Sequence, residues 1–288
     1  MQLLDDRIKP NSNIFLIGDT HEGAKLFDDD GWNAFVEMMH SPYDDCKNNY
    51  YVDHGDSIEA IQVDDHRYGI AETAECRTLN QMTSAVERRR KISDMCLAWL
   101  MGNHEYKLQK FGDITAKMAA ELGVQYGTYS CKLTYRSNRS NSDNILFKHF
   151  ATHGFGSMQH LAGDEEQRLA NMKVKMKRLL RFKASDCYLM SMGHTHRLLT
   201  RPPLLKLNMI DDGTKLRQVY DTPLFKFRQG DILHEDMRWY CNTGSFLKTM
   251  GIGFSGYAER WGLDPNIIGF NVAIVRDGRL VNVREERI

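Results

Sequence analysis

Five short clusters of polar residues stand beside glycines in this chain, and each offers side chains that can bind a metal ion. The clusters are Gly18-Asp19-Thr20-His21, Gly55-Asp56-Ser57-Ile58-Glu59, Gly102-Asn103-His104-Glu105, His153-Gly154 and Gly193-His194-Thr195-His196. Imidazole and carboxylate groups suit divalent transition metals, and none of the six cysteines falls within a cluster. One such cluster is a weak signal, because a surface loop can carry the same residues. Five of them in one chain predict a shared site.

The spacing within two of the clusters favours a dinuclear metal site. Residues i and i+2 of an extended chain point to the same side, so Asp19 and His21 can face one ion, as can His194 and His196. Two cations about 3.5–4 Å apart can clamp the attacking and leaving oxygens of a displacement at phosphorus. A hydroxide shared between them would be the nucleophile. The predicted chemistry is therefore hydrolysis of a phosphoester.

Apolar stretches precede most of the clusters, and we interpret these stretches as buried strands. Ligands of open α/β sheets collect beyond the carboxyl ends of the strands, which would bring the polar residues together. Strands are expected at residues 13–18, 49–53, 99–101, 125–135, 145–152 and 186–192. Helices are expected at residues 32–40, within 71–99 and at 165–183. Antiparallel strands are expected later, at 204–209, 217–220, 238–242, 267–275 and 279–283.

The order DxH, GDxxE, GNHE, HG and GHTH resembles the five-part signature of calcineurin-like metallophosphoesterases, and it spans about two thirds of the chain. The resemblance implies an α/β fold, a layered α-β-β-α sandwich in which helices flank two mixed β-sheets. We expect residues 1–288 to form a single domain of this type. The segment Cys241–Trp261 is also similar to phosphoesterases carried by bacteriophages.

The resemblance also implies which residues hold two divalent metal ions. The first ion would be held by Asp19, His21 and His196, the second by Asn103, His153 and His194, with Asp56 bridging both. Manganese is the preferred ion, while iron, zinc and nickel suit the same ligands.

The remaining catalytic roles fall on two residues of the same signature. His104 would be the general acid that protonates the leaving oxygen, and Glu59 would orient its imidazole. Asn103 and His104 are also expected to contact the substrate. Glu59 stands where the family often has an aspartate, so its longer side chain is a departure from the pattern.

Two other departures favour a phosphodiester over a phosphoprotein substrate. Ala60 and Met101 stand where the protein phosphatases of the superfamily have phosphate-binding arginines. Residues 168–183 carry seven basic side chains and no acidic one, so Lys173 and Lys177 are candidates for contact with a nucleic-acid backbone. A phosphomonoesterase or protein phosphatase remains the alternative, as does a non-catalytic scaffold of the same fold. A solvated helix face would explain the basic residues equally well.

The composition adds limits on partners and location. Lys plus Arg and Asp plus Glu both number 38, so the net charge is zero and the chain as a whole attracts neither nucleic acid nor membrane. The scattered cysteines and the absence of a signal-like start predict a reducing cytoplasm. We expect a phosphoester substrate and no membrane partner, and the sequence leaves the oligomeric state open.

Overall fold

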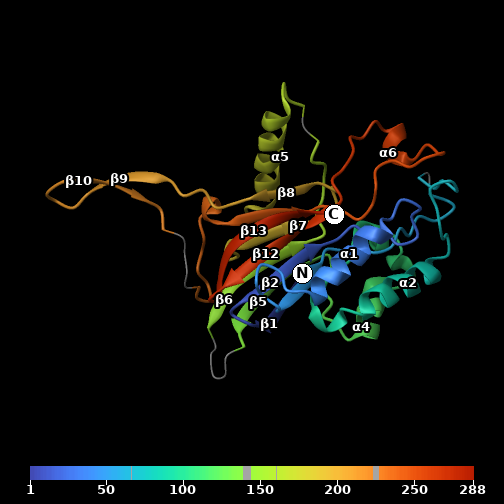
Figure 1. The fold of residues 1–288 in the computed structure, drawn as a ribbon, viewed down its shortest axis with the longest axis horizontal. Helices are drawn as coiled ribbons and strands as arrows, with labels where there is room; N and C mark the ends of the chain where they lie inside the picture. The colour runs from blue at the N-terminus through green and yellow to red at the C-terminus, as the bar shows by residue number, and fades with distance from the viewer. Residues whose placement is uncertain (66, 139–143, 160, 223–226) are drawn as a thin grey trace.

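The computed structural model describes residues 1–65, 67–138, 144–159, 161–222 and 227–288. Within them, two large mixed sheets pack face to face, and helices cover their outer faces (Figure 1). The predicted layered α-β-β-α sandwich is therefore confirmed. Between the sheets lies a buried apolar core whose central members include Leu16, Val52, Leu133, Leu189 and Ala273.

One sheet has five strands and carries the first three polar clusters. Its order is β13 (Arg279–Arg287), β12 (Gly269–Arg276), β2 (Ser12–Ile17), β3 (Asn49–Asp53) and β4 (Cys96–Trp99). β2, β3 and β4 are parallel to one another, so their carboxyl ends meet at one edge. The helices on this side are α1 (Asp29–His40), α2 (Thr78–Arg90), the one-turn α3 (Asn103–Tyr106) and α4 (Ile114–Leu122).

The other sheet has six strands and carries the last two clusters. Its order is β1 (Gln2–Ile8), β5 (Ser130–Ser137), β6 (Ile145–Thr152), β7 (Leu189–Met192), β11 (Trp239–Thr243) and β8 (Leu198–Arg201). β6 runs parallel to β7. The long helix α5 (Glu165–Leu180) covers the outer face of this sheet, where Met172, Met176 and Leu180 are buried against the strands.

Several boundaries differ from those that the sequence predicts. Within residues 71–99 only α2 and a single 3-10 turn (Ser93–Met95) are helical, and the chain from 71 to 77 forms turns and bends. β1 and β8 were not expected. β1 is an edge strand with Asp5, Asp6 and Arg7 in its middle, which hides the usual apolar pattern. β11 lies parallel to β7 rather than in a purely antiparallel arrangement.

A third, two-stranded sheet stands away from the sandwich. It consists of β9 (Leu207–Asp211) and β10 (Leu216–Tyr220), which form the arm that projects at the left of Figure 1. On the opposite side of the molecule, the one-turn helix α6 (Tyr257–Arg260) lies in a long loop. Across the described ranges, every helix is too short or too polar to cross a membrane.

Candidate metal centre

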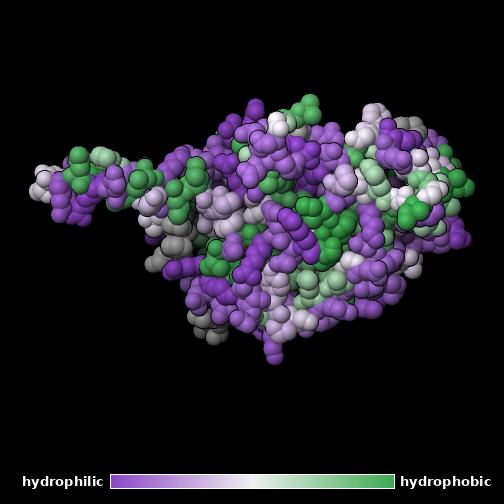
Figure 2. All heavy atoms as spheres, turned by 45° about the horizontal axis from the view of Figure 1, so that its top comes forward, coloured by the Kyte–Doolittle hydropathy of each residue, from purple (hydrophilic) through white to green (hydrophobic). Residues whose placement is uncertain are grey.

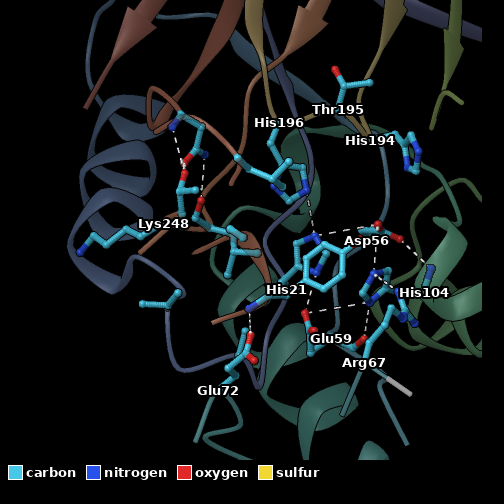
Figure 3. Close-up of a pocket in the computed structure, with 18 of the residues that line it drawn as sticks. His21, Asp56, Glu59, Arg67, Glu72, His104, His194, Thr195, His196 and Lys248 are labelled. Atoms are coloured by element: carbon cyan, nitrogen blue, oxygen red, sulfur yellow. Dashed lines mark hydrogen bonds and ion pairs between the residues drawn. The ribbon is translucent and has the colours of Figure 1, made fainter. Parts of the chain in front are cut away.

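The predicted ligands from both sheets come together in one place. Three groups of side chains have possible ligand atoms within 4.8 Å of one another and could hold a metal ion. These groups are Asp19-His21-His196, His21-Glu59-His104 and Asp56-His153-His194. All but His196, His194 and Glu59 are buried, and those three are partly buried. Figure 3 shows how closely the members that it labels lie to one another.

The first group joins the end of β2 to the loop after β7. His21 Nε2 and His196 Nε2 are 3.2 Å apart, and His196 Nε2 lies 3.4 Å from Asp19 Oδ1. The other oxygen of Asp19, Oδ2, accepts a hydrogen bond from the backbone N–H of His194 at 2.9 Å. Asp19 is thus oriented by the second sheet while Oδ1 faces the imidazoles.

The predicted ligands of the other ion, Asn103, His153 and His194, meet at the side-chain oxygen of Asn103. Asn103 Oδ1 lies 2.9 Å from His153 Nε2 and 2.6 Å from His194 Nδ1. His153 is held in this orientation because its Nδ1 donates to the carbonyl of His54 at 2.8 Å. Such outer partners fix both the tautomer and the direction of a ligating imidazole.

Asp56 lies between the two groups, as expected of a bridging ligand. Its Oδ2 is 3.9 Å from His21 Nε2 and 3.3 Å from His153 Nε2. Its Oδ1 accepts the backbone N–H of His104 at 2.8 Å, which leaves Oδ2 directed at the imidazoles.

The backbone at these positions takes a conformation that L-residues seldom adopt. Asp19, His21, Asp56, His194 and His196 all have φ between 48° and 70°. Left-handed backbone at a residue other than glycine costs about 1–3 kcal/mol, and such residues gather at functional sites. Five of the seven predicted ligands have this strained backbone. The loops therefore hold these five side chains in positions that an unstrained backbone would not give them.

Glycines let the loops after β3 and β4 approach each other. A Cβ added to Gly55 would lie 2.5 Å from the backbone nitrogen of Gly102, and one added to Gly102 would lie 2.0 Å from Asp56 Oδ1. A side chain at Gly55 would therefore displace the backbone of Met101 and Gly102, and one at Gly102 would displace Asp56.

The residues present fit a bound cation. Asp19 Oδ1 is buried and accepts no hydrogen bond among the described residues, although its carboxylate is completely enclosed. A buried polar oxygen without a donor is costly unless it coordinates a metal. The donors are nitrogen and oxygen atoms, which suit divalent transition metals.

The electrostatics of the candidate ligands also favour a bound cation. Burial alone would lower the pKa of His21, but Glu59, Asp56 and Asp19 outweigh it and raise the pKa to about 9. Burial likewise opposes a charge on His153, yet Asp56 raises its pKa to about 9. The carboxylates thus draw positive charge into the centre, and a cation would replace protons there.

His104 lies beside the centre, and the structure places Glu59 differently from the expected role. The carboxylate of Glu59 lies 2.7 Å from His21 Nδ1 and 3.9 Å from His104 Nδ1. His104 Nδ1 instead donates to the backbone carbonyl of Glu59, which directs Nε2 towards the cavity. Burial lowers the pKa of His104, partly offset by Asp56 and Glu59.

Sequence reasoning missed two residues that shape the centre. Glu105 accepts backbone N–H groups from Ser57 at 2.6 Å and Gly102 at 3.0 Å, so its carboxylate joins the loops that carry Asp56 and Asn103. Glu105 is part of the GNHE cluster, and this position is the only sign in the sequence that it belongs to the site.

Arg67 is the second missed residue. Its Nη1 lies 3.4 Å from His104 Nε2, and Asp65 holds the guanidinium through contacts of 3.0 and 2.8 Å (Figure 3). An arginine therefore reaches the site from seven residues beyond Ala60, where the sequence pattern had shown none. No periodicity marks the irregular loop that carries Arg67.

Lys173 and Lys177, predicted to contact the substrate, lie on α5 and do not line the described cavity at the centre. Lys177 is buried, and its Nζ pairs with Glu235 at 3.1 Å and with Asp236. It therefore fixes α5 to the chain before β11. Lys173 lies partly exposed on the same helix.

A cavity of about 430 Å³ opens over the candidate centre. One wall carries the metal-binding side chains and His104, and the opposite wall is formed by residues 247–249 and 257–266. The cations that line the described part already have acidic partners. Arg67 pairs with Asp65, Lys248 with Asp28 at 2.8 Å, and Arg197 with Asp264 at 3.8 Å.

Comparisons with known proteins leave the family unassigned. No protein-family model and no curated protein sequence matches this chain. The geometry of the centre is therefore the basis for assigning a function.

Proposed function

We propose that this protein is a dinuclear-metal phosphoesterase that favours phosphodiesters. The observation that carries the proposal is the convergence of six other nitrogen and oxygen ligands around Asp56, from strand ends of both sheets. An ion-pair network that only stabilises the fold does not require so many buried histidines near one carboxylate. A pair of bound cations does require them, as ligands.

Two divalent ions, with manganese preferred, would occupy the centre. Asp19, His21 and His196 would hold one, Asn103, His153 and His194 the other, and Asp56 Oδ2 would face both. When bound, such ions activate water as a nucleophile and neutralise charge on the phosphoryl oxygens.

His104 would then supply a proton to the leaving oxygen. Its Nδ1 is fixed by the carbonyl of Glu59, so its Nε2 faces the cavity where the ester would lie. Because burial lowers the pKa of His104, the protonated imidazole is a stronger acid than usual. An anionic ester beside it would favour the protonated form.

The charge balance of the cavity favours a diester. A phosphomonoester carries close to two negative charges, and proteins usually bind it with free arginines. Here Arg67, Arg197 and Lys248 are each paired with a carboxylate already. A diester carries a single negative charge and needs less compensation from the protein.

The test is paired hydrolysis of bis-p-nitrophenyl phosphate and p-nitrophenyl phosphate with added Mn²⁺. We expect faster hydrolysis of the diester, and its loss in Asp56→Asn, because the substitution removes a negative charge from between the two ligand groups. Preference for the monoester would overturn the diester assignment. Metal binding without hydrolysis of either ester would favour the scaffold alternative.

His104→Ala provides a second arm of this test. The imidazole lies outside the two proposed ligand sets, so metal content measured by mass spectrometry should stay the same while turnover falls by about 10²–10⁴-fold. Full activity in this variant would show that His104 is not the acid.

A further inference from the structure

The arm formed by residues 207–220 stands clear of the sandwich. All ten residues of its two strands are exposed, and Figure 1 shows it projecting from the body. An isolated two-stranded hairpin is marginally stable at best in water. The arm therefore needs a partner surface, and its chemistry indicates which one.

Both faces of the arm are partly apolar. Figure 2 shows apolar side chains in green on the side of the arm that faces the viewer, at the left. The cross-strand pairs Leu207–Tyr220 and Met209–Gln218 lie on one face with Leu216, and Ile210 and Val219 lie on the other. Met209 is 62% exposed and Leu216 is 71% exposed. A hairpin that stays exposed to solvent is expected to have at least one face made of polar residues.

The whole molecule also has more surface than a monomer of its size should have. A compact chain of 33.3 kDa is expected to expose about 12,600 Å², whereas this chain exposes 14302 Å². The excess of about 1,700 Å² is more than the roughly 800 Å² that each partner buries in a standard interface. A second copy of the chain could cover it.

The free edge of β9 is suited to pair with itself. Lys206 O and Lys215 O accept hydrogen bonds across the arm from Asp221 and Asp212, which makes the even-numbered residues of β9 face β10. The N–H and C=O groups of Leu207, Met209 and Asp211 consequently point outward. An antiparallel copy centred on Met209 would meet these groups in a regular ladder.

We propose that the protein forms a two-fold dimer through β9, with Met209 paired to Met209 of the partner subunit. A strand that pairs antiparallel with its own copy obeys two-fold symmetry automatically. The resulting sheet has four strands, β10-β9-β9-β10, and its apolar faces are extended across the two copies.

Charge supports this register. Pairing about Met209 brings Lys206 opposite Asp212 of the partner subunit, so opposite charges meet at both ends of the strand pair. Within one chain, Lys206 also pairs with Asp236 at 2.6 Å and Asp212 with Arg217 at 2.8 Å. β9 carries no charge between Leu207 and Ile210, and it contains no proline that would block an edge. The outer edge of β10 is less suitable, because Arg217 lies in its middle.

The first experiment compares Met209→Pro with Gln218→Pro by light scattering across a dilution series. Each substitution removes one outward N–H from an edge of the arm and leaves the bonds between β9 and β10 in place. The native chain and Gln218→Pro should have about twice the mass of one chain, and Met209→Pro should have the mass of one. A monomeric native chain overturns the proposal, as does a dimer that persists in Met209→Pro.

The second experiment fixes the register by cross-linking. Opposed residues of a hydrogen-bonded pair have Cα atoms about 5.5 Å apart, which a disulfide can span. In a Cys76→Ser background, which removes the exposed native thiol, Met209→Cys should form an intersubunit disulfide under mild oxidation. Leu207→Cys should not, because it faces Asp211 of the partner subunit. Equal cross-linking of both variants would overturn the Met209-centred register.

Discussion

At the scale of single residues, Glu105 does more for the centre than its place in the sequence suggests. Its two oxygens accept backbone N–H groups from opposite sides, at Ser57 and Ile58 through Oε1 and at Gly102 through Oε2. Burial, with Asp56 nearby, raises its pKa to about 7. The carboxylate thus binds two loops whose ligands must stay aligned.

Glu105→Gln should weaken metal binding without touching a ligand. The amide oxygen of glutamine can accept hydrogen bonds on one side only. On the other side its NH₂ group would face a backbone N–H group, which is also a donor. Loss of an outer partner typically lowers metal affinity by about 10–100-fold. Calorimetric titration with Mn²⁺ would measure the change. Glu121→Gln, on the exposed face of α4, serves as the control, and an unchanged affinity in Glu105→Gln would contradict the assigned role.

The sequence predicted which side chains come together at the candidate centre better than it predicted the surroundings of those side chains. Asp19, His21 and Asp56 could be found because an apolar strand and a glycine mark the place where each side chain emerges. Arg67 could not be found, since an irregular loop has no periodicity that reveals where it turns back. The paired state of Lys177 was equally hidden, because ion pairs with Glu235 and Asp236 depend on tertiary contact.

At the scale of secondary-structure elements, one buried arginine attaches α2 to the five-stranded sheet. Arg89 Nε and Nη2 both lie 2.8 Å from Asp53 Oδ2 at the end of β3, and both side chains are buried. The guanidinium also packs over the rings of Trp32 and Trp99. The pairing holds the helix against the strand that leads directly into Asp56.

Arg89→Ala should destabilise the fold by about 3–5 kcal/mol, because it leaves Asp53 buried without its counter-charge. Arg90→Ala is the matched control on the same helix. Arg90 pairs with Glu87 and Glu121 at the surface, so its removal should cost less than about 0.5 kcal/mol. Urea unfolding measures both values, and equal effects would contradict the role assigned to Arg89.

The edge strand β1 should make stability depend on pH through Asp6. Burial raises the pKa of Asp6 to about 6, although Gln125 donates a hydrogen bond to it. A carboxyl whose pKa is higher in the folded state loses stability as the pH rises from about 4 to 6. Asp6→Asn should therefore match the native chain below pH 4 and exceed its stability by about 1 kcal/mol at pH 7, after allowance for solvent screening. Chemical denaturation across this range would show the difference, and a constant offset would contradict it.

Strand and helix patterns predicted most of the layered fold. β3 and β6 have the bounds that the sequence predicts, Asn49–Asp53 and Ile145–Thr152. β1 was missed because an edge strand exposes one side and can carry charges in its middle. Helix was also expected from residue 71 because helix-forming residues are common there, whereas the structure has turns and bends over 71–77 and α2 begins at Thr78.

At the scale of the whole molecule, the ligands divide between the two sheets. Asp19, His21, Asp56 and Asn103 follow β2, β3 and β4, whereas His153, His194 and His196 follow β6 and β7. Bound ions should therefore stabilise the sandwich as a unit. At a free metal concentration of about 100 times Kd, the gain is about 2.7 kcal/mol.

Thermal unfolding with Mn²⁺ and with a chelator tests this coupling. We expect a higher midpoint with metal in the native chain and a much smaller change in Asp56→Asn, which lacks the carboxylate between the two ligand groups. The same rise in both proteins would show that the ion acts elsewhere.

Because the ligands come from both sheets, the centre would also affect how fast the chain unfolds. His21 and His196 are 175 residues apart, yet their Nε2 atoms nearly touch. Ions held there would act as a removable cross-link that closes most of the chain into a loop and must be released before the sheets can part. Metal supply would then govern how long the folded molecule lasts, as well as whether it can act.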